Sequence, residues 1–298
     1  MLSNLYTAVE NESSLPPTGE AFIAGYLTGR GRLQSGMQDT DTQAGSGRYF
    51  RVKTRNPDEL DFVEMALEYI TGSSTVATPP TVTLHWHDAI ESVIEFLSQY
   101  SKKYAQLQKD IEATGYTVED NEFWRLYNTA LDHPVDVLPE NTEAVEEGFV
   151  SGVLDAGQFS LHISKQPPND RHYLREIYCL PLSRLNSLDL TRVKARLDEF
   201  DIPHYRAERD SVGSLSVANS NVLDVFTKVV GFERSIRNRY ILDFYQAEVG
   251  ESLCYETEPE KFHSVFSMYT EFFGGSSRYS PDDFNPDNNL EEGVEQIM

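Results

Sequence analysis

The sequence is short of cysteine and of long apolar runs, and both shortages narrow the class of protein. Only two cysteines, Cys179 and Cys254, occur in 298 residues. That is too few for a disulfide scaffold or a cysteine-rich zinc site, so both are expected to be reduced thiols. No apolar run approaches the roughly 18 residues of a membrane-spanning helix. The first residues also lack the basic-then-apolar order of a signal peptide. These features predict a cytoplasmic protein without a membrane partner.

Lysine is also scarce, in a chain that is strongly acidic. Asp and Glu number 48 against 25 Lys and Arg, a formal net charge of -23, and the bases comprise 17 Arg and only 8 Lys. The acids are scattered rather than grouped in blocks. Such a surface is typical of proteins in a cytosol of very high salt, as in a haloarchaeon. The alternative is an acidic interaction protein at ordinary salt, and the scatter favours the first interpretation.

Several motifs of cofactor-dependent enzymes are missing. The sequence has no Walker loop, no dinucleotide-binding glycine pattern and no nucleophile elbow. His85 and His87 alternate along a predicted strand, but two imidazoles alone do not make a metal site. Asp39 and Asp41 lack the glycine and glutamate of a calcium-binding loop. We therefore predict no cofactor and no metal.

One stretch is present twice. Residues 22–33 and 149–161 each begin with an apolar helix of about two turns. A turn of small residues comes next, and then a strand in which apolar and polar residues alternate. Both copies carry a small residue and a glycine at the same step, Ala24-Gly25 and Ser151-Gly152. Small side chains let two helix backbones approach more closely than the usual 8–10 Å or so. The two helices are predicted to pack against each other about a pseudo-twofold axis.

This repeated pattern resembles the LAGLIDADG family of homing endonucleases and intron maturases. Residues 23–31 and 150 to about 158 occupy the places of the family's nine-residue motif. The resemblance implies an α+β fold of two pseudo-symmetric αββαββα repeats, whose antiparallel sheets form a saddle over double-stranded DNA. It also implies that the acid just before the last glycine of each motif binds the divalent metal that cuts DNA.

The chain departs from the family at those acids. The metal-binding position holds Arg30 in the first copy, and Thr28 stands at the motif's earlier Asp. In the second copy Asp155 keeps the earlier position. The metal-binding position there is Gly157, or is deleted if Gly157 matches the motif's final glycine. Mg²⁺ takes oxygen ligands, carboxylates above all, and an arginine would repel it. We therefore predict a protein that does not cut DNA, with residual nuclease activity through Asp155 as the competing hypothesis.

The repeat sets the predicted domain organisation. Residues 1–110 form the first repeat, 111–140 a helical connector, 141–248 the second repeat and 249–298 a C-terminal helix with a disordered acidic tail. The motif helices are offset by 127 residues. The helices that close the repeats, which contain Ile90 and Val222, are offset by 132. Loops easily absorb a difference of five residues.

A basic stretch marks the first repeat. Residues 30–55 hold six bases and only two acids, Asp39 and Asp41. Alternation puts Arg51, Lys53 and Arg55 on one strand face, and side chains at every second position lie about 6–7 Å apart, close to the spacing of phosphates along one DNA strand. The second repeat gives a weaker match, in which bases are mixed with acids. The predicted DNA-binding residues are Arg30, Arg32, Arg48, Arg51, Lys53, Arg55, Arg171, Arg175 and Arg206.

Two kinds of function remain open. The first is a monomeric, non-catalytic protein that binds double-stranded DNA, such as a transcription or replication regulator. The second is a protein-interaction module that uses the acidic surface or tail, or a degenerate homing-endonuclease remnant without a DNA role. In that case the strand arginines pair with acids or solvate an exposed sheet face. The net charge of -23 favours the second kind, and the basic strands favour the first.

Overall fold

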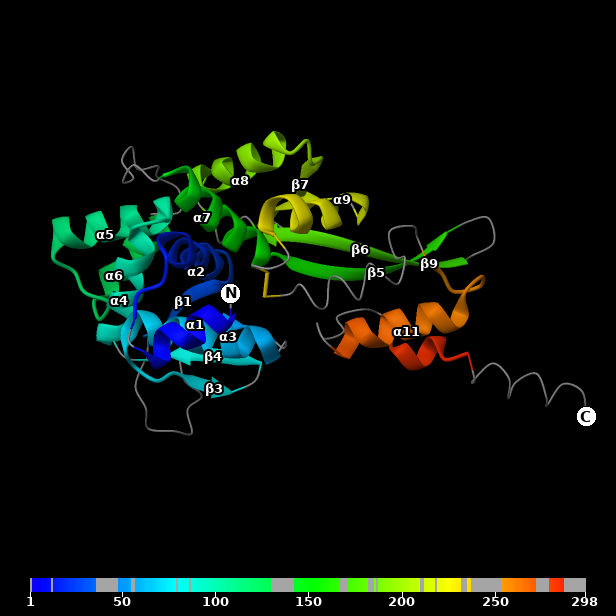
Figure 1. Ribbon diagram of the computed structural model, residues 1–298, viewed down its shortest axis with the longest axis horizontal. Helices are drawn as coiled ribbons and strands as arrows, with labels where there is room; N and C mark the ends of the chain where they lie inside the picture. The colour runs from blue at the N-terminus through cyan, green and yellow to red at the C-terminus, as the bar shows by residue number, and fades with distance from the viewer. Residues whose placement is uncertain are drawn as a thin grey trace, which may run out of the picture.

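The chain folds as two α+β halves that meet mainly through one pair of helices (Figure 1). The computed structural model describes residues 2–11, 13–35, 48–54, 57–78, 80–85, 87–129, 142–166, 171–181, 185, 187–209, 212–217, 219–231, 235–236, 253–271 and 279–286. In this part of the chain no helix is long and apolar enough to cross a membrane.

The first half is an antiparallel sheet with the strand order β1-β2-β4-β3, covered by helices. Its helices begin where the sequence favours them: α2 and α3 each have Pro at the first position, and acids follow in the first turn. The elements are α1 (Leu2–Glu10), α2 (Pro17–Arg30), β1 (Gly31–Ser35), β2 (Arg48–Lys53), α3 (Pro57–Thr71), β3 (Val76–Thr78), β4 (Thr81–Leu84) and α4 (His87–Ser98).

The second half repeats this order around a sheet of order β5-β6-β8-β7, with the short strand β9 also paired to β6. From the motif helix onward, both halves therefore run αββαββα, which confirms the predicted mixed α+β fold with antiparallel sheets. The elements are α7 (Glu143–Asp155), β5 (Gln158–Gln166), β6 (Arg171–Pro181), α8 (Ser187–Glu199), β7 (His204–Arg209), β8 (Val212–Val217), α9 (Asn219–Asp224) and the π-helix η2 (Val225–Val230).

The motif helices α2 and α7 touch backbone to backbone, as predicted. A Cβ added at Gly25 would lie 1.9 Å from the carbonyl oxygen of Phe149, and one added at Gly152 would lie 2.0 Å from the carbonyl oxygen of Phe22. The two contacts are related by the pseudo-twofold axis. Gly148 makes a similar approach to the backbone of Thr18, at 2.5 Å. Only glycine fits at these steps, because any side chain would collide with the facing backbone.

Two further helices follow the first half in the sequence and pack on it. α5 (Lys102–Thr114) and α6 (Asn121–Thr129) follow α4 directly, and the predicted boundary after residue 110 falls inside α5. The ammonium of Lys103 is buried and lies 2.8 Å from the hydroxyl of Tyr127. A second link reaches the other half, where the buried carboxylate of Asp189 accepts a hydrogen bond of 2.8 Å from the Ser101 hydroxyl.

The C-terminal region is more ordered than predicted. Strand β9 (Leu253–Cys254), helix α11 (Pro259–Tyr269) and the 3₁₀ turn η4 (Pro281–Phe284) follow the second half. The side chain of Phe284 is only 3% exposed, and its ring packs on Phe262 and Tyr255. The prediction of a disordered tail is therefore wrong for residues 279–286, because these aromatic side chains form a small core. Residues 237–248, the end of the predicted second repeat, lie outside the described residues.

We predict that Gly25→Ala destabilises the protein by about 3 kcal/mol or more, because the new methyl group would overlap the Phe149 carbonyl. Thermal unfolding followed by circular dichroism measures the effect. The matched control is Gly19→Ala in the same helix, where a Cβ would meet nothing closer than Leu15 Cβ at 3.6 Å. Equal melting temperatures for the two variants would contradict the backbone contact.

A second prediction concerns the attachment of the C-terminal region through Glu256. Partial burial alone would raise the pKa of this carboxyl, but hydrogen bonds from His172 and the Cys254 thiol outweigh burial and lower the pKa below its ordinary value of 4.5. An acid with a lowered pKa stabilises the fold above its unfolded-state pKa and loses that effect as the pH falls through its folded-state pKa. Glu256→Gln should therefore lower the melting temperature at pH 7, and the difference should shrink below pH 4.5. A pH-independent difference would exclude this role.

Candidate nucleic-acid interface

The outer face of the first sheet carries a row of side chains that crosses all four strands. The register pairs Arg32 with Arg51, Arg51 with Thr83 and Thr83 with Val76. Residues directly opposite in an antiparallel pair share a face, with Cβ atoms about 4.5–5.5 Å apart. Arg32 is exposed and Arg51 is half-buried. Two guanidinium groups therefore lie side by side on one face of the sheet.

Carboxylates are absent from these strands. The residues of β1, β2, β3 and β4 include Arg32, Arg48, Arg51 and Lys53 but no Asp or Glu, in a chain with 48 acids. Among the described residues, no carboxylate forms an ion pair with Arg32, Arg51 or Lys53. In the described part of the chain, these bases therefore do not pair with neighbouring acids. Like charges in direct opposition destabilise a sheet, so this face suits an anionic ligand.

Two polar rows flank the arginines. Lys53 pairs with Thr81, which pairs with Thr78. On the other side Gln34 pairs with Tyr49, whose ring lies 5.9 Å from that of His85. Gln34, Tyr49 and His85 are not among the site residues predicted from the sequence, because all of the predicted residues are arginines or a lysine. The alternation of β2, which puts Tyr49 on the same face as Arg51, was the signal that could have identified them.

Two predicted site residues of the first half do not lie on this face. Arg30 ends helix α2 rather than starting the strand, and its Nη2 lies 3.6 Å from a carboxylate oxygen of Glu59. Arg48 alternates onto the face of Phe50, and its guanidinium donates hydrogen bonds to the Val118 carbonyl and the Asn121 side chain. The prediction is corrected for both, because helix packing turns Arg30 inward and the connector binds Arg48. Arg55 lies outside the described residues.

The register divides the predicted residues of the second half. Arg171 and Arg175 are separated by four positions on β6 and share a face, to which Tyr205 of β7 also belongs. Arg206 pairs with Leu215, which pairs with Leu180, so it belongs to the opposite face, the one that carries the buried Leu174. By register, Arg206 does not share the strand face of Arg171 and Arg175, because one strand step reverses the face, and its role in DNA binding stays a prediction.

The ends of the two motif helices do not form a metal site. In the first copy Glu59 is buried, accepts a hydrogen bond of 2.9 Å from Tyr26, and also binds Thr54 and Arg30. Nε and Nη1 of Arg30 are buried without a hydrogen-bond partner in the described part of the chain. The guanidinium of Arg30 thus occupies the space beside Glu59.

The second copy does not supply a ligand either. Asp155 is fully buried, and its two oxygens accept hydrogen bonds from the Ser235 hydroxyl at 2.7 Å and the Ile236 amide at 2.9 Å. Among the residues that the structure describes, no group of three His, Cys, Asp or Glu side chains could hold a metal ion. The divalent metal implied by the LAGLIDADG resemblance therefore does not fit these residues.

Comparison with known proteins adds likenesses in structure alone. No protein-family model matches the chain, and no curated protein sequence matches it. The LAGLIDADG meganuclease I-AabMI bound to uncleaved DNA is similar over 88% of this chain and 100% of its own, at 14% identity and a TM-score of 0.46. I-SmaMI bound to an uncleavable DNA is similar over 88% and 99%, at 12% identity and a TM-score of 0.47.

A third similar structure is the homing endonuclease I-GzeII in complex with its DNA target. The likeness covers 89% of this chain and 100% of the other, at 10% identity and a TM-score of 0.45. At such low TM-scores, the assignment of residues to the interface rests on the strand register and charges of this chain itself.

We predict opposite effects of Arg51→Gln on stability and on anion binding. Loss of the repulsion between Arg32 and Arg51 should stabilise the fold by about 0.2–1 kcal/mol, measured by thermal unfolding. Retention on heparin should fall, because one cation of the acid-free face is lost. The control is Lys109→Gln, an equal change of charge at an exposed position of α5, which should alter neither value. A destabilised Arg51→Gln protein would contradict the arrangement.

Proposed function

We propose that this chain is a double-stranded DNA-binding protein that does not cut DNA, and that it acts as a transcription or replication regulator. The observation that carries the proposal is the acid-free outer face of the first sheet, with Arg32 and Arg51 side by side and Lys53 one row away. A surface of this sign is exceptional in a chain of net charge -23. The sequence resemblance to LAGLIDADG proteins supports the same use of the sheets.

The spacing of these bases supports a phosphate backbone as the ligand. Arg51 and Lys53 lie two residues apart on β2, a rise of about 6–7 Å, which is close to the distance between successive phosphates of one DNA strand. The neighbouring Gln34, Tyr49 and His85 carry hydrogen-bonding groups that can contact base edges or sugars. Phosphate contacts would position the protein, and the polar row would read the sequence.

The surroundings of the motif helices support the absence of cleavage. Phosphodiester cleavage by this family needs a metal, and Arg30 and the fully engaged Asp155 do not provide ligands for one. The hypothesis of residual nuclease activity through Asp155 loses its basis, because both oxygens of that carboxylate already serve the fold. The positive charge of Arg30 also lowers the affinity of the end of α2 for Mg²⁺.

Salt determines how such a face could work in a concentrated cytosol. Three phosphate contacts give a slope of about -2.7 in log K against log salt, so affinity falls about 500-fold between 0.1 M and 1 M KCl. Arginine is suited to this condition, because its planar fork pairs with phosphate or guanine at contact range rather than through a screened field. The excess of Arg over Lys in the chain is consistent with a protein that binds at high salt.

Selection from a library of random duplexes tests the proposal, followed by titration of the enriched duplex over a range of KCl concentrations. We expect a preferred sequence, and Arg32→Gln/Arg51→Gln should reduce the salt slope by about 1.8. Lys109→Gln, which also removes a positive charge but lies away from the sheet, serves as the control. Binding should be the same in EDTA and in Mg²⁺, and Mg²⁺ or Mn²⁺ should produce no nicking. No preferred duplex, or a double variant that binds like the parent, would reject DNA binding; metal-dependent nicking would reject the non-catalytic role.

A protein-interaction role is the second candidate, and one observation favours it. The outer side of helix α3 presents carboxylates without a base on that helix. Co-purification separates the two functions: a stoichiometric protein that survives nuclease treatment supports this role, whereas bound DNA supports the first.

A further inference from the structure

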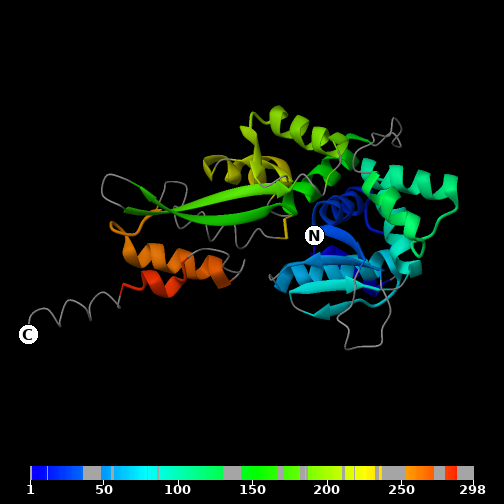
Figure 2. The ribbon, with the colours of Figure 1, turned by 180° about the vertical axis from the view of Figure 1, so that it is seen from behind.

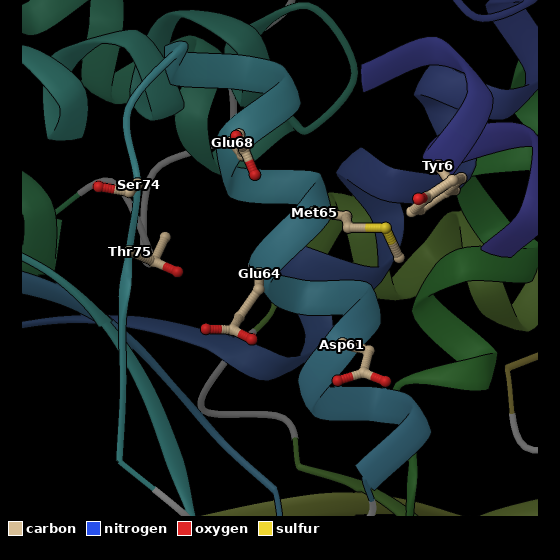
Figure 3. A pocket seen from close by; sticks show the side chains of 7 residues that line it. All are labelled: Tyr6, Asp61, Glu64, Met65, Glu68, Ser74 and Thr75. Atoms are coloured by element: carbon tan, nitrogen blue, oxygen red, sulfur yellow. The ribbon is translucent and has the colours of Figure 1, made fainter. Parts of the chain in front are cut away.

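A groove crosses the outer side of helix α3, on the part of the first half away from the motif helices (Figure 3). Its volume is about 420 Å³. Figure 3 shows Glu64 and Glu68 on the side of α3 that faces Ser74 and Thr75, while Met65 points towards Tyr6 of α1. The groove therefore has one acidic wall, a hydroxyl-bearing wall opposite, and apolar side chains beyond the helix.

The negative charge of this groove is not balanced locally. Helix α3 carries Asp58, Glu59, Asp61, Glu64 and Glu68 and no basic residue, and α1 carries one acid and no base. In the described part of the chain, Asp61, Glu64 and Glu68 form no ion pair. Tyr6 is 53% exposed beside them. The groove thus combines uncompensated carboxylates with an exposed aromatic ring, which suits a cationic partner.

Among the described strands, an unpaired sheet edge continues from the same wall. Ser74 and Thr75 lead directly into β3, the last strand of the order β1-β2-β4-β3. All three residues of β3 are exposed, and Val76 retains 54% of its surface. Val76-Ala77-Thr78 contains neither a lysine nor a proline, two residues that commonly blunt an edge strand, although the strand is only three residues long and two prolines follow it in the sequence. The opposite edge differs, because the connector reaches β1 and β2: the Tyr127 hydroxyl of α6 is hydrogen-bonded to the backbone of Leu33, and Arg48 donates hydrogen bonds to the Val118 carbonyl and the Asn121 side chain.

We propose that this edge and groove bind an extended basic segment of a partner protein, which pairs with β3 as an additional strand. Strand addition uses the free backbone groups of an edge, and pockets for alternate side chains provide specificity. Alternate residues of a strand lie about 6.6–6.8 Å apart, and Glu64 and Glu68 are separated by about 6 Å along their helix. Lysine or arginine at every second position of the segment would therefore meet successive carboxylates. The charge of the wall excludes nucleic acid as the occupant.

The test uses a fluorescein-labelled peptide of three Lys-Val repeats and the full-length protein, with anisotropy as the readout. The peptide should bind, and Glu64→Gln/Glu68→Gln should weaken it about tenfold. The matched control is Glu260→Gln/Glu271→Gln, which removes two exposed carboxylates from the C-terminal region and should leave affinity within about twofold. A peptide N-methylated at alternate residues keeps its charge but loses strand hydrogen bonds, and should bind about tenfold more weakly.

Three results would overturn the proposal: no binding of the parent peptide, equal weakening by the two double variants, or unchanged binding of the N-methylated peptide. Equal weakening by the two double variants would mean that the acidic protein attracts any polycation. Unchanged binding of the N-methylated peptide would mean that charge alone holds the peptide. These results do not depend on DNA binding, because the binding of an enriched duplex is measured separately. Both Glu→Gln double variants should still bind that duplex. Circular dichroism of each variant verifies that the fold is intact, since these side chains lie on the surface.

Discussion

The contact between the backbones of α2 and α7 is the constraint on which the rest of the molecule depends. Gly25 and Gly152 let each helix touch the carbonyl oxygens of the other, at a distance that a single methyl group would prevent. Because β1 starts immediately after α2 and β5 soon after α7, the glycines also determine where both sheets begin. The start of each sheet in turn determines which face of its strands points outward.

Packing at the end of α2 explains how Arg30 is accommodated in the interior. Glu59 lies beside it, so the buried charges are partly compensated within the protein. Tyr26 and Thr54 donate further hydrogen bonds to Glu59. Breaking such a buried pair leaves an uncompensated charge and costs several kcal/mol, about 3–5 in typical cases. Arg30 is thus part of the core.

The two halves differ in what surrounds their sheets. The connector helices reach the first sheet through Arg48, whereas the aromatic core around Phe284 attaches to β6 through β9 and Glu256. Helices α8 and α9 lie on one side of the β5–β6 hairpin and α11 on the other in both views (Figures 1 and 2). Arg171 and Arg175 lie on the same strand face of β6 by register. The basic character is stronger in the first half, where no acid interrupts the strands.

The sequence by itself determined the repeat, the glycine-mediated helix pair and most elements, because hydrophobic periodicity and small-residue spacing are local signals that the core must obey. It also determined which face carries Arg51 and Lys53, since alternation within one strand needs no partner. Only the tertiary structure decided the roles of Arg30, Arg48 and Arg206, which depend on Glu59, Val118 and Leu215, residues outside their own elements. It alone showed that Phe284 completes an aromatic core, because no sequence window contains the rings that bury it.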